Sequence, residues 1–157
     1  METEIDISMV NNVSEIEIVY KSKVRASLRP RIKDSKDAAV IFKKYWNENK
    51  IGLLEESFAM YLNRANKVLA IMQVSAGGIC GTVVDPRIIF STALKLAACS
   101  LIFAHNHPSQ SLQPSQADIE LTKTIKEGGK LLQIKVLDHL ILGEEDAYYS
   151  MSDSGII

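Results

Sequence analysis

The stretch SLIFAHNHPSQSLQPSQAD (residues 100–118) joins a short apolar run to a polar loop and then to the start of a helix. The run 100–104 is typical of a strand that is buried on both faces. Farther on, Ser115 is a good helix N-cap, and Asp118 places an acid at the positive end of the helix dipole. The stretch therefore predicts a strand, a loop and a helix, with polar side chains gathered where the strand ends.

These polar side chains match the ligands of a zinc ion. His105 and His107 are two residues apart, so both imidazoles project to the same side if the chain stays extended. Asp118 adds a carboxylate from the following helix. Two nitrogens and one oxygen suit zinc, and three protein ligands leave the fourth tetrahedral position open for water, as in catalytic sites. Bound zinc lowers the pKa of that water to ~7, which gives a hydroxide nucleophile at neutral pH.

Each half of this motif also has an ordinary structural explanation. Ser115 and Asp118 alone form a helix-capping signature, and a His-x-His pair alone is commonly a solvated loop or a pair of histidines at the edge of a core. Finding two histidines, a serine and an aspartate at these offsets has a chance probability on the order of 10⁻⁴ at average residue usage. The combination therefore favours a metal site.

The bulk composition fits one globular domain with a sizeable core: 157 residues, 46% hydrophobic and 24% charged. The net charge of −1 predicts no general attraction to nucleic acid or anionic membranes. Cys80 and Cys99 lack Cys-x-x-Cys spacing and suit buried thiols in a reducing compartment. The chain shows neither a signal sequence nor an apolar run of the ~20 residues that cross a bilayer, so we expect a cytoplasmic protein without membrane contact.

Outside this stretch, the sequence alternates between strand and helix patterns. Apolar–polar alternation from Glu15 predicts a strand, and seven basic side chains within residues 21–36 predict an extended arm. The further predicted elements are a helix over 36–47 after the N-cap Ser35, a hairpin of strands 57–63 and 67–73 that turns at 64–66, a helix over 86–98 after the N-cap Asp85, a helix from Ser115 to Glu127 closed by Gly128 and Gly129, and a strand over 134–142 followed by a hairpin-like segment. Strands interleaved with helices predict an α/β or α+β fold with a mixed sheet.

Several other features are assigned structural roles. His139 lies in an apolar strand, so we expect a core histidine or one that supports a ligand, rather than a ligand itself. Trp46 is expected in the core. The glycine-rich segment 77–81 predicts a backbone bend, because it matches no phosphate-binding motif. The basic arm is expected to be solvated, with contact to nucleic-acid phosphates as the alternative.

The motif His105-x-His107, seven residues, Ser115, two residues, Asp118 resembles the H-x-H-x7-S-x2-D signature of the JAMM/MPN metallohydrolases. Several segments resemble the bacterial RadC branch of that family: HNHPS, PSQAD and VLDHLIL, together with LNRANKVL and GGICGTVVDPR in the same order. The resemblance covers residues 35–157. Residues 1–34 are then an N-terminal strand and basic arm, expected to be partly disordered.

The resemblance implies a JAMM/MPN-like (cytidine-deaminase-like) mixed sheet flanked by helices, with Zn²⁺ held by His105, His107 and Asp118. It also implies that Ser115 hydrogen-bonds the metal water or the oxyanion, and that an upstream acid is the general base. Counting without a gap points to Glu55, whereas the Glu-x-Phe pattern points to Glu56. An insertion within a strand is costly to ladder pairing, so Glu55 is favoured and Glu56 is expected to face the opposite, solvated side.

The predicted function is a zinc-dependent hydrolase, a RadC-like metallopeptidase, acting on a peptide or amide substrate that the sequence does not identify. Asn106 stands where deubiquitinating relatives often carry Ser or Thr, which argues against an isopeptide substrate. The alternative is a non-catalytic or DNA-associated RadC-like module in DNA repair or recombination. A metal-dependent nuclease is a weaker third hypothesis, and the oligomeric state is left open.

Overall fold

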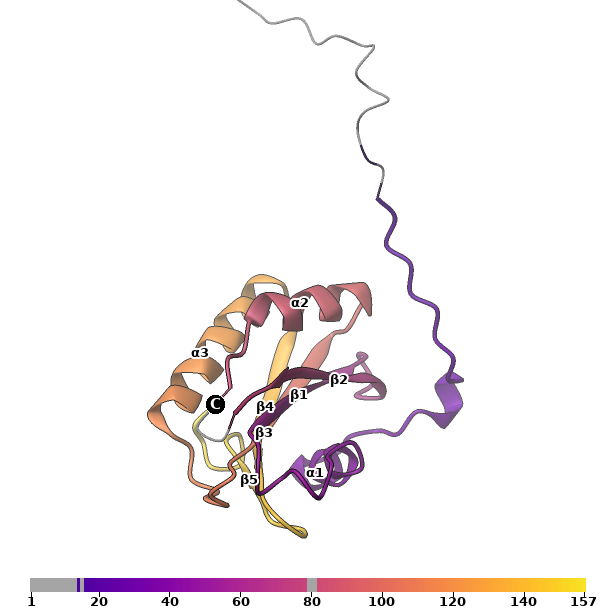
Figure 1. The fold of residues 1–157 in the computed structure, drawn as a ribbon. Helices are drawn as coiled ribbons and strands as arrows, with labels where there is room; N and C mark the ends of the chain where they lie inside the picture. The colour runs from indigo at the N-terminus through magenta and orange to yellow at the C-terminus, as the bar shows by residue number, and fades with distance from the viewer. Residues whose placement is uncertain (1–13, 15, 79–81) are drawn as a thin grey trace, which may run out of the picture.

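The computed structural model describes residues 14, 16–78 and 82–157, and its centre is a mixed five-stranded sheet of order β2-β1-β3-β4-β5 (Figure 1). The strands are β1 (Glu56–Leu62), β2 (Val68–Ala76), β3 (Ser100–Asn106), β4 (Lys135–Leu142) and β5 (Tyr148–Ser150). Strands β3 and β4 are parallel, and the other neighbouring pairs are antiparallel. The predicted α+β class, the β1–β2 hairpin and the C-terminal hairpin are confirmed.

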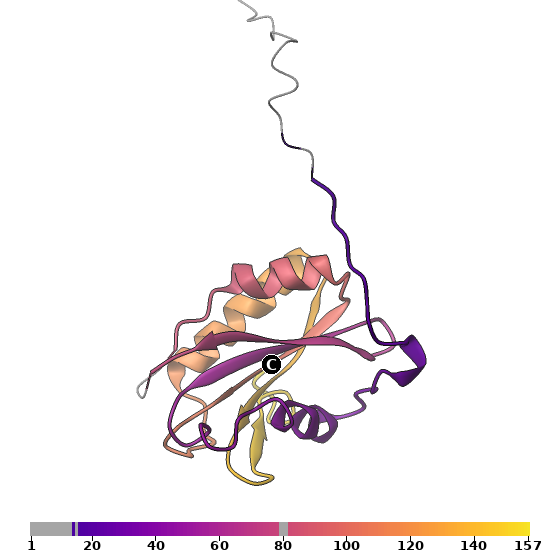
Figure 2. The same cartoon turned by 45° about the vertical axis from the view of Figure 1, so that its right-hand side comes forward.

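Three helices cover the two faces of the sheet: α1 (Ser35–Lys43), α2 (Pro86–Lys95) and α3 (Gln116–Leu131). Helices α2 and α3 lie on one face and α1 lies on the other, as Figures 1 and 2 show. The predicted cap of α2 is confirmed, because the Asp85 carboxylate accepts a hydrogen bond from the Arg87 amide. No helix in the described part of the chain is long and apolar enough to span a membrane.

Side-chain alternation along β1 and β3 divides the core between the two faces. Even-numbered residues of both strands pack in the cluster that contains the α1 side chains, and odd-numbered residues pack with α2 and α3. The even set is Phe58, Met60, Leu62, Ile102 and Ala104, and the odd set is Ala59, Tyr61, Leu101 and Phe103. This alternation also decides which residues at the strand ends can face α3.

The N-terminal strand prediction is wrong for the residues that the structure describes. Residues 16–20 form no strand, and Ile16 is 86% exposed on an arm that leads away from the domain (Figure 2). Glu15 itself lies outside the described residues. The alternating pattern has no neighbouring strand to pair with in this part of the chain, and an unpaired strand is not stable. The arm joins the domain at Arg31, whose backbone forms an isolated antiparallel β-bridge with Lys67, and at Ile32, which is buried in the core.

The first helix differs from its prediction at both ends. The N-cap is Asp34 instead of Ser35, since the Asp34 carboxylate accepts from the Asp37 amide at 2.9 Å. Ser35 donates its hydroxyl hydrogen to Asp153 in the C-terminal segment instead. The helix ends at Lys43, before Trp46, and the indole is buried in the core as predicted.

The two glycines predicted to end α3 lie inside the helix, which continues to Leu131. A β-carbon at Gly128 would lie 2.7 Å from the Phe90 ring of α2, and one at Gly129 would overlap the carbonyl oxygen of Ile134. Both glycines therefore permit close packing of α3 against its neighbours. The helix ends at Leu131 with Leu132 as its C-cap, followed by Gln133 in the left-handed conformation with φ 57°.

The prediction that both cysteines are buried is wrong for Cys99, whose side chain is exposed. The main chain of Cys99 bonds to Leu62 and to Lys135, because residue 99 begins the pairing of β3 with both neighbouring strands. Its thiol points outward just before the buried run begins. Cys80 lies outside the described residues.

Candidate metal centre

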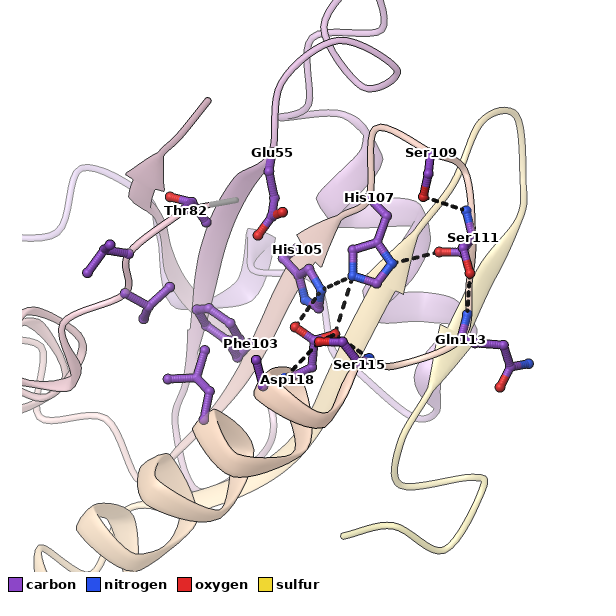
Figure 3. Close-up of a pocket in the computed structure, with 14 residues that line it drawn as sticks. Glu55, Thr82, Phe103, His105, His107, Ser109, Ser111, Gln113, Ser115 and Asp118 are labelled. Carbon is purple, nitrogen blue, oxygen red and sulfur yellow. Dashed lines mark hydrogen bonds and ion pairs between the residues drawn. The ribbon is translucent and has the colours of Figure 1, made fainter. Parts of the chain in front are cut away.

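The three predicted ligands meet at the end of β3 (Figure 3). His105 is on β3, which is longer than predicted; His107 follows it directly, and Asp118 comes from the first turn of α3. One ligand atom from each residue lies within 4.8 Å of the others. The two Nε2 atoms are 2.9 Å apart, and each lies 3.3 Å from an oxygen of Asp118. This cluster could bind a metal ion.

His107 is oriented by the loop that follows it. Its Nδ1 lies 2.8 Å from the Ser111 carbonyl oxygen, which can only accept, so Nδ1 carries the hydrogen. Nε2 is therefore the atom that faces Asp118 and His105. The hydrogen bond with Asp118 raises the pKa of His107 against the opposing effect of burial, with smaller contributions from Ser111 and from the charge of Glu55.

Asp118 serves the helix cap and the cluster at once. Its Oδ2 accepts from the backbone and hydroxyl of Ser115, both at 2.7 Å, and the Asp118 amide donates to the Ser115 hydroxyl. Burial opposes ionisation, but the interactions with His105, His107 and Ser115 hold the pKa of Asp118 well below its ordinary value. The carboxylate is thus ionised and fixed in place, as a metal ligand must be.

The two candidate general bases lie on opposite faces of the sheet. Glu55 is half-buried in the same cleft as the cluster, and Figure 3 shows its carboxylate pointing toward the two histidines. Glu56 is on the α1 side, where its carboxylate accepts from Gln73 at 2.9 Å. Glu56 is only 5% exposed, so the expectation that it is solvated is wrong. Of the two candidates, only Glu55 lines the cleft that contains the cluster.

Asn106, between the two histidines, holds the segment that carries Glu55. Its amide nitrogen donates to the carbonyl oxygens of Ile51 at 2.6 Å and Leu54 at 2.9 Å. Its amide oxygen accepts from the Trp46 indole and from the Glu56 backbone amide. The even-numbered position explains this role, because it faces α1 while its histidine neighbours face α3. Sequence reasoning considered Asn106 only as a substitution in the motif.

His139 supports the cluster without joining it. The ring is 1% exposed, with Nε2 2.7 Å from Nδ1 of His105 and Nδ1 2.5 Å from the Thr122 hydroxyl. Burial holds the pKa of His139 well below its ordinary value, so the ring is neutral. The prediction of a buried histidine that is no ligand is in accord with this geometry. Thr122 was not singled out by sequence, although it is one helical turn after Asp118 and on the same side of α3.

Gln110, in the loop after His107, has a backbone conformation that usually favours glycine. Its φ is 61°, in the left-handed region that glycine occupies without strain. The Gln110 side chain accepts from the Glu144 amide at 2.9 Å. This contact ties the loop after His107 to the β4–β5 hairpin.

The cluster opens into a cleft of about 690 Å³. One end is polar and is formed by the loop between His107 and α3, whereas the opposite wall is apolar. The polar end includes Ser109, Ser111 and Gln113, and the apolar wall includes Val83, Val84, Phe103 and Leu121. A molecule bound in the cleft could therefore contact a polar surface and an apolar surface on either side of the cluster.

The fold and the cluster define an α+β domain with a candidate metal centre at the carboxyl end of a central strand. The RadC-like JAB domain matches residues 32–156, and the chain belongs to that family. It is 43% identical to a "UPF0758 protein" of Flavobacterium johnsoniae over 150 residues, which cover 94% of this chain and 63% of that protein.

Two further relatives bear the same name. A "UPF0758 protein" of Methanosarcina mazei is 37% identical over 127 residues, 81% of this chain and 54% of the relative. One from Porphyromonas gingivalis is 38% identical over 103 residues, 66% of this chain and 45% of the relative. The matched region is thus less than two thirds of each of these relatives, and their printed names state no activity.

Proposed function

We propose that this domain is a zinc-dependent hydrolase that cleaves a peptide or amide bond. The supporting observation is that His105, His107 and Asp118 converge in one cleft into which Glu55 also points. Two imidazole nitrogens and one carboxylate oxygen are the donor types of catalytic zinc sites. Ca²⁺ and Mg²⁺ prefer all-oxygen sets, so the two imidazoles argue for zinc.

The surrounding side chains have the chemistry that amide hydrolysis requires. When bound, zinc supplies a Lewis acid that lowers the pKa of water to ~7. The Glu55 carboxylate accepts the proton of the attacking water and returns it to the leaving nitrogen. The Ser115 hydroxyl, which now donates to Asp118, can rotate to donate to the developing oxyanion.

The metal assignment is tested by the zinc content of the purified protein after exposure to excess zinc and desalting. We expect about one zinc ion per chain in the wild type and a large loss in His105→Ala and His107→Ala. Gln113→Ala is the matched control, since it lines the same cleft without offering a ligand, and it should keep the metal. A wild-type protein that retains no zinc would contradict the proposal.

The base assignment is tested with Glu55→Gln and Glu56→Gln on a library of quenched fluorogenic peptides. Glu55→Gln should retain zinc and lose about 10²–10⁴-fold in turnover. Glu56→Gln should retain most of the turnover, because its side chain lies on the far side of the sheet. The opposite pattern would assign the base to Glu56, and no turnover in wild type on any peptide would remove the peptidase proposal.

A second candidate function is contact with nucleic-acid phosphates through the arm. Lys21, Lys23 and Arg25 are exposed on the segment that leads away from the domain. Phosphate contacts give an affinity that falls steeply as salt concentration rises. Replacing these three side chains with glutamine should abolish a salt-dependent affinity for a DNA duplex; an affinity that the replacement leaves unchanged would rule out the arm.

A further inference from the structure

The hydrogen-bond chain behind the cluster begins at the backbone of one ligand. The Thr122 hydroxyl lies 2.6 Å from the carbonyl oxygen of Asp118, one helical turn before it. A carbonyl oxygen only accepts, and a hydroxyl has one hydrogen to donate, so that hydrogen points to Asp118. The sulfur of Met151 lies 3.4 Å away and is the weaker acceptor.

The direction of this first bond fixes the next one. The Thr122 oxygen is also 2.5 Å from Nδ1 of His139, and its only hydrogen is already used. It must therefore accept, so Nδ1 of His139 carries a hydrogen. The His139 ring is fully enclosed and packs edge-on against Phe103, with ring centroids 4.8 Å apart. A neutral ring carries one hydrogen, which leaves Nε2 of His139 as an acceptor.

The last hydrogen bond determines which nitrogen of the candidate ligand His105 carries a hydrogen. Nε2 of His139 lies 2.7 Å from Nδ1 of His105, so the hydrogen between them belongs to His105. The lone pair of neutral His105 is then on Nε2, the atom that faces His107 and Asp118. If the order of hydrogens were reversed, Nε2 of His105 would carry a hydrogen and could not bind a metal.

We propose that Thr122 and His139 are positioning residues that fix the tautomer and the ring orientation of His105 as a metal ligand. The chain runs from the backbone of Asp118 on α3, through His139 on β4, to His105 on β3, so it also holds two ligands from different elements in register. Partners of this kind typically change metal affinity by 10–100-fold when they are removed. The proposal rests on the metal site proposed above.

The first test measures the zinc dissociation constant of the whole chain by competition with a chelator. Thr122→Val should raise the dissociation constant about 10–100-fold, whereas Thr122→Ser, which keeps the hydroxyl, should stay within about threefold of wild type. Thr124→Val is the matched control, because the Thr124 hydroxyl also donates to a backbone carbonyl of the same helix, that of Glu120, but is exposed and makes no hydrogen bond to His139. Wild-type affinity in a folded Thr122→Val protein would overturn the proposal.

The second test reads the hydrogen order directly and does not need a variant. Side-chain ¹⁵N NMR of the zinc-free and the zinc-loaded protein should show His139 with its hydrogen on Nδ1. A hydrogen on Nε2 of His139 would overturn the proposal even if zinc binds tightly. Conversely, a wild type that binds no zinc would refute the proposed function, while the His139 spectrum of that protein still decides the hydrogen order.

Discussion

The side-chain oxygen of Asn106 accepts a buried hydrogen bond of 2.9 Å from the backbone amide of Glu56. Through this bond and those to Ile51 and Leu54, the residue between the two histidines fixes the segment that presents Glu55 to the cleft. The amide group of Asn106 uses both donor hydrogens and both acceptor positions. The metal motif and the candidate general base are therefore mechanically connected through one side chain.

Asn106→Ala should lower the free energy of unfolding by about 3 kcal/mol, because it leaves several buried backbone groups without partners. It should also reduce turnover more than zinc content, since the ligands are on the other face. Urea unfolding and metal analysis measure the two effects. Asn49→Ala is the control: this asparagine is exposed, and the substitution should change stability by less than about 0.5 kcal/mol. Equal stability of the two variants would contradict the assigned role.

Zinc should stabilise the protein against heat. A ligand at 100 times its dissociation constant adds about 2.7 kcal/mol, which for a chain of this size raises Tm by roughly 5–10 °C. The rise should be absent in His107→Ala, and Mg²⁺ at the same concentration should give none, because it prefers oxygen ligands. A Tm that zinc raises equally in wild type and His107→Ala would place the ion elsewhere.

Gly129→Ala should destabilise the protein, although alanine normally favours a helix by about 1 kcal/mol over glycine. The new methyl group would overlap the backbone carbonyl of Ile134, which cannot move without disturbing the entry into β4. We expect a net loss of about 1–3 kcal/mol, as for other overpacked sites, measured by urea unfolding.

Gly128→Ala meets a side chain instead of the backbone, so its effect should be relieved by a second substitution. The methyl group would crowd the Phe90 ring, and Gly128→Ala with Phe90→Leu should be more stable than the sum of the single changes predicts. Lys126→Ala, at an exposed position of the same helix, controls for helix propensity. Simple additivity would show that the ring does not limit this position.

Tyr61 should make stability depend on pH in the alkaline range. Burial raises the pKa of Tyr61 to about 12, against a smaller opposing effect of a hydrogen bond with Thr92. The unfolded chain releases this proton from about pH 10, whereas the folded chain holds it until about pH 12. The folded state therefore binds more protons in this window, and stability falls as pH rises through it.

The comparison with Tyr61→Phe isolates this contribution. At about pH 8 the wild type should be more stable by about 1 kcal/mol, owing to the hydrogen bond from Tyr61 to the Ile89 carbonyl. At about pH 11 the wild type should have lost about 1.4 kcal/mol more than the variant, so its advantage of about 1 kcal/mol is lost and the variant becomes slightly the more stable of the two. Tyr45→Phe, at an exposed position, should show no such change.

The sequence allowed the fold class, the order of elements and the meeting of the three candidate ligands to be predicted, because each depends on local patterns. The predictions were wrong where contacts between residues far apart in the sequence determine the local structure. Gly128 and Gly129 have the local signature of a helix end, but Phe90 and Ile134 determine their use. The strand from Glu15 has the right alternation and no partner among the described residues.

Roles that depend on contacts across the sheet were equally hidden from the sequence. Thr122 contacts His139 through the packing of α3 on β4, and the hydrogen bond from Asn106 to Ile51 joins segments more than fifty residues apart. Glu55 and Glu56 face opposite sides of the sheet because consecutive side chains alternate along an extended chain. Which of the two faces the cluster is known only once the pairing of β1 with β3 is known.

The alternation of β3 has a consequence for how this domain can change. Because His105 and Asn106 point in opposite directions, deleting one residue from the strand would exchange their surroundings. It would remove the candidate ligand His105 and the hydrogen bonds of Asn106 together. A deletion in this strand should therefore cost more than a substitution of either residue alone, because it removes both roles at once. The proposed hydrolase can acquire new substrate preferences at the rim of the cleft, where Val83 is exposed and lies outside the two core clusters.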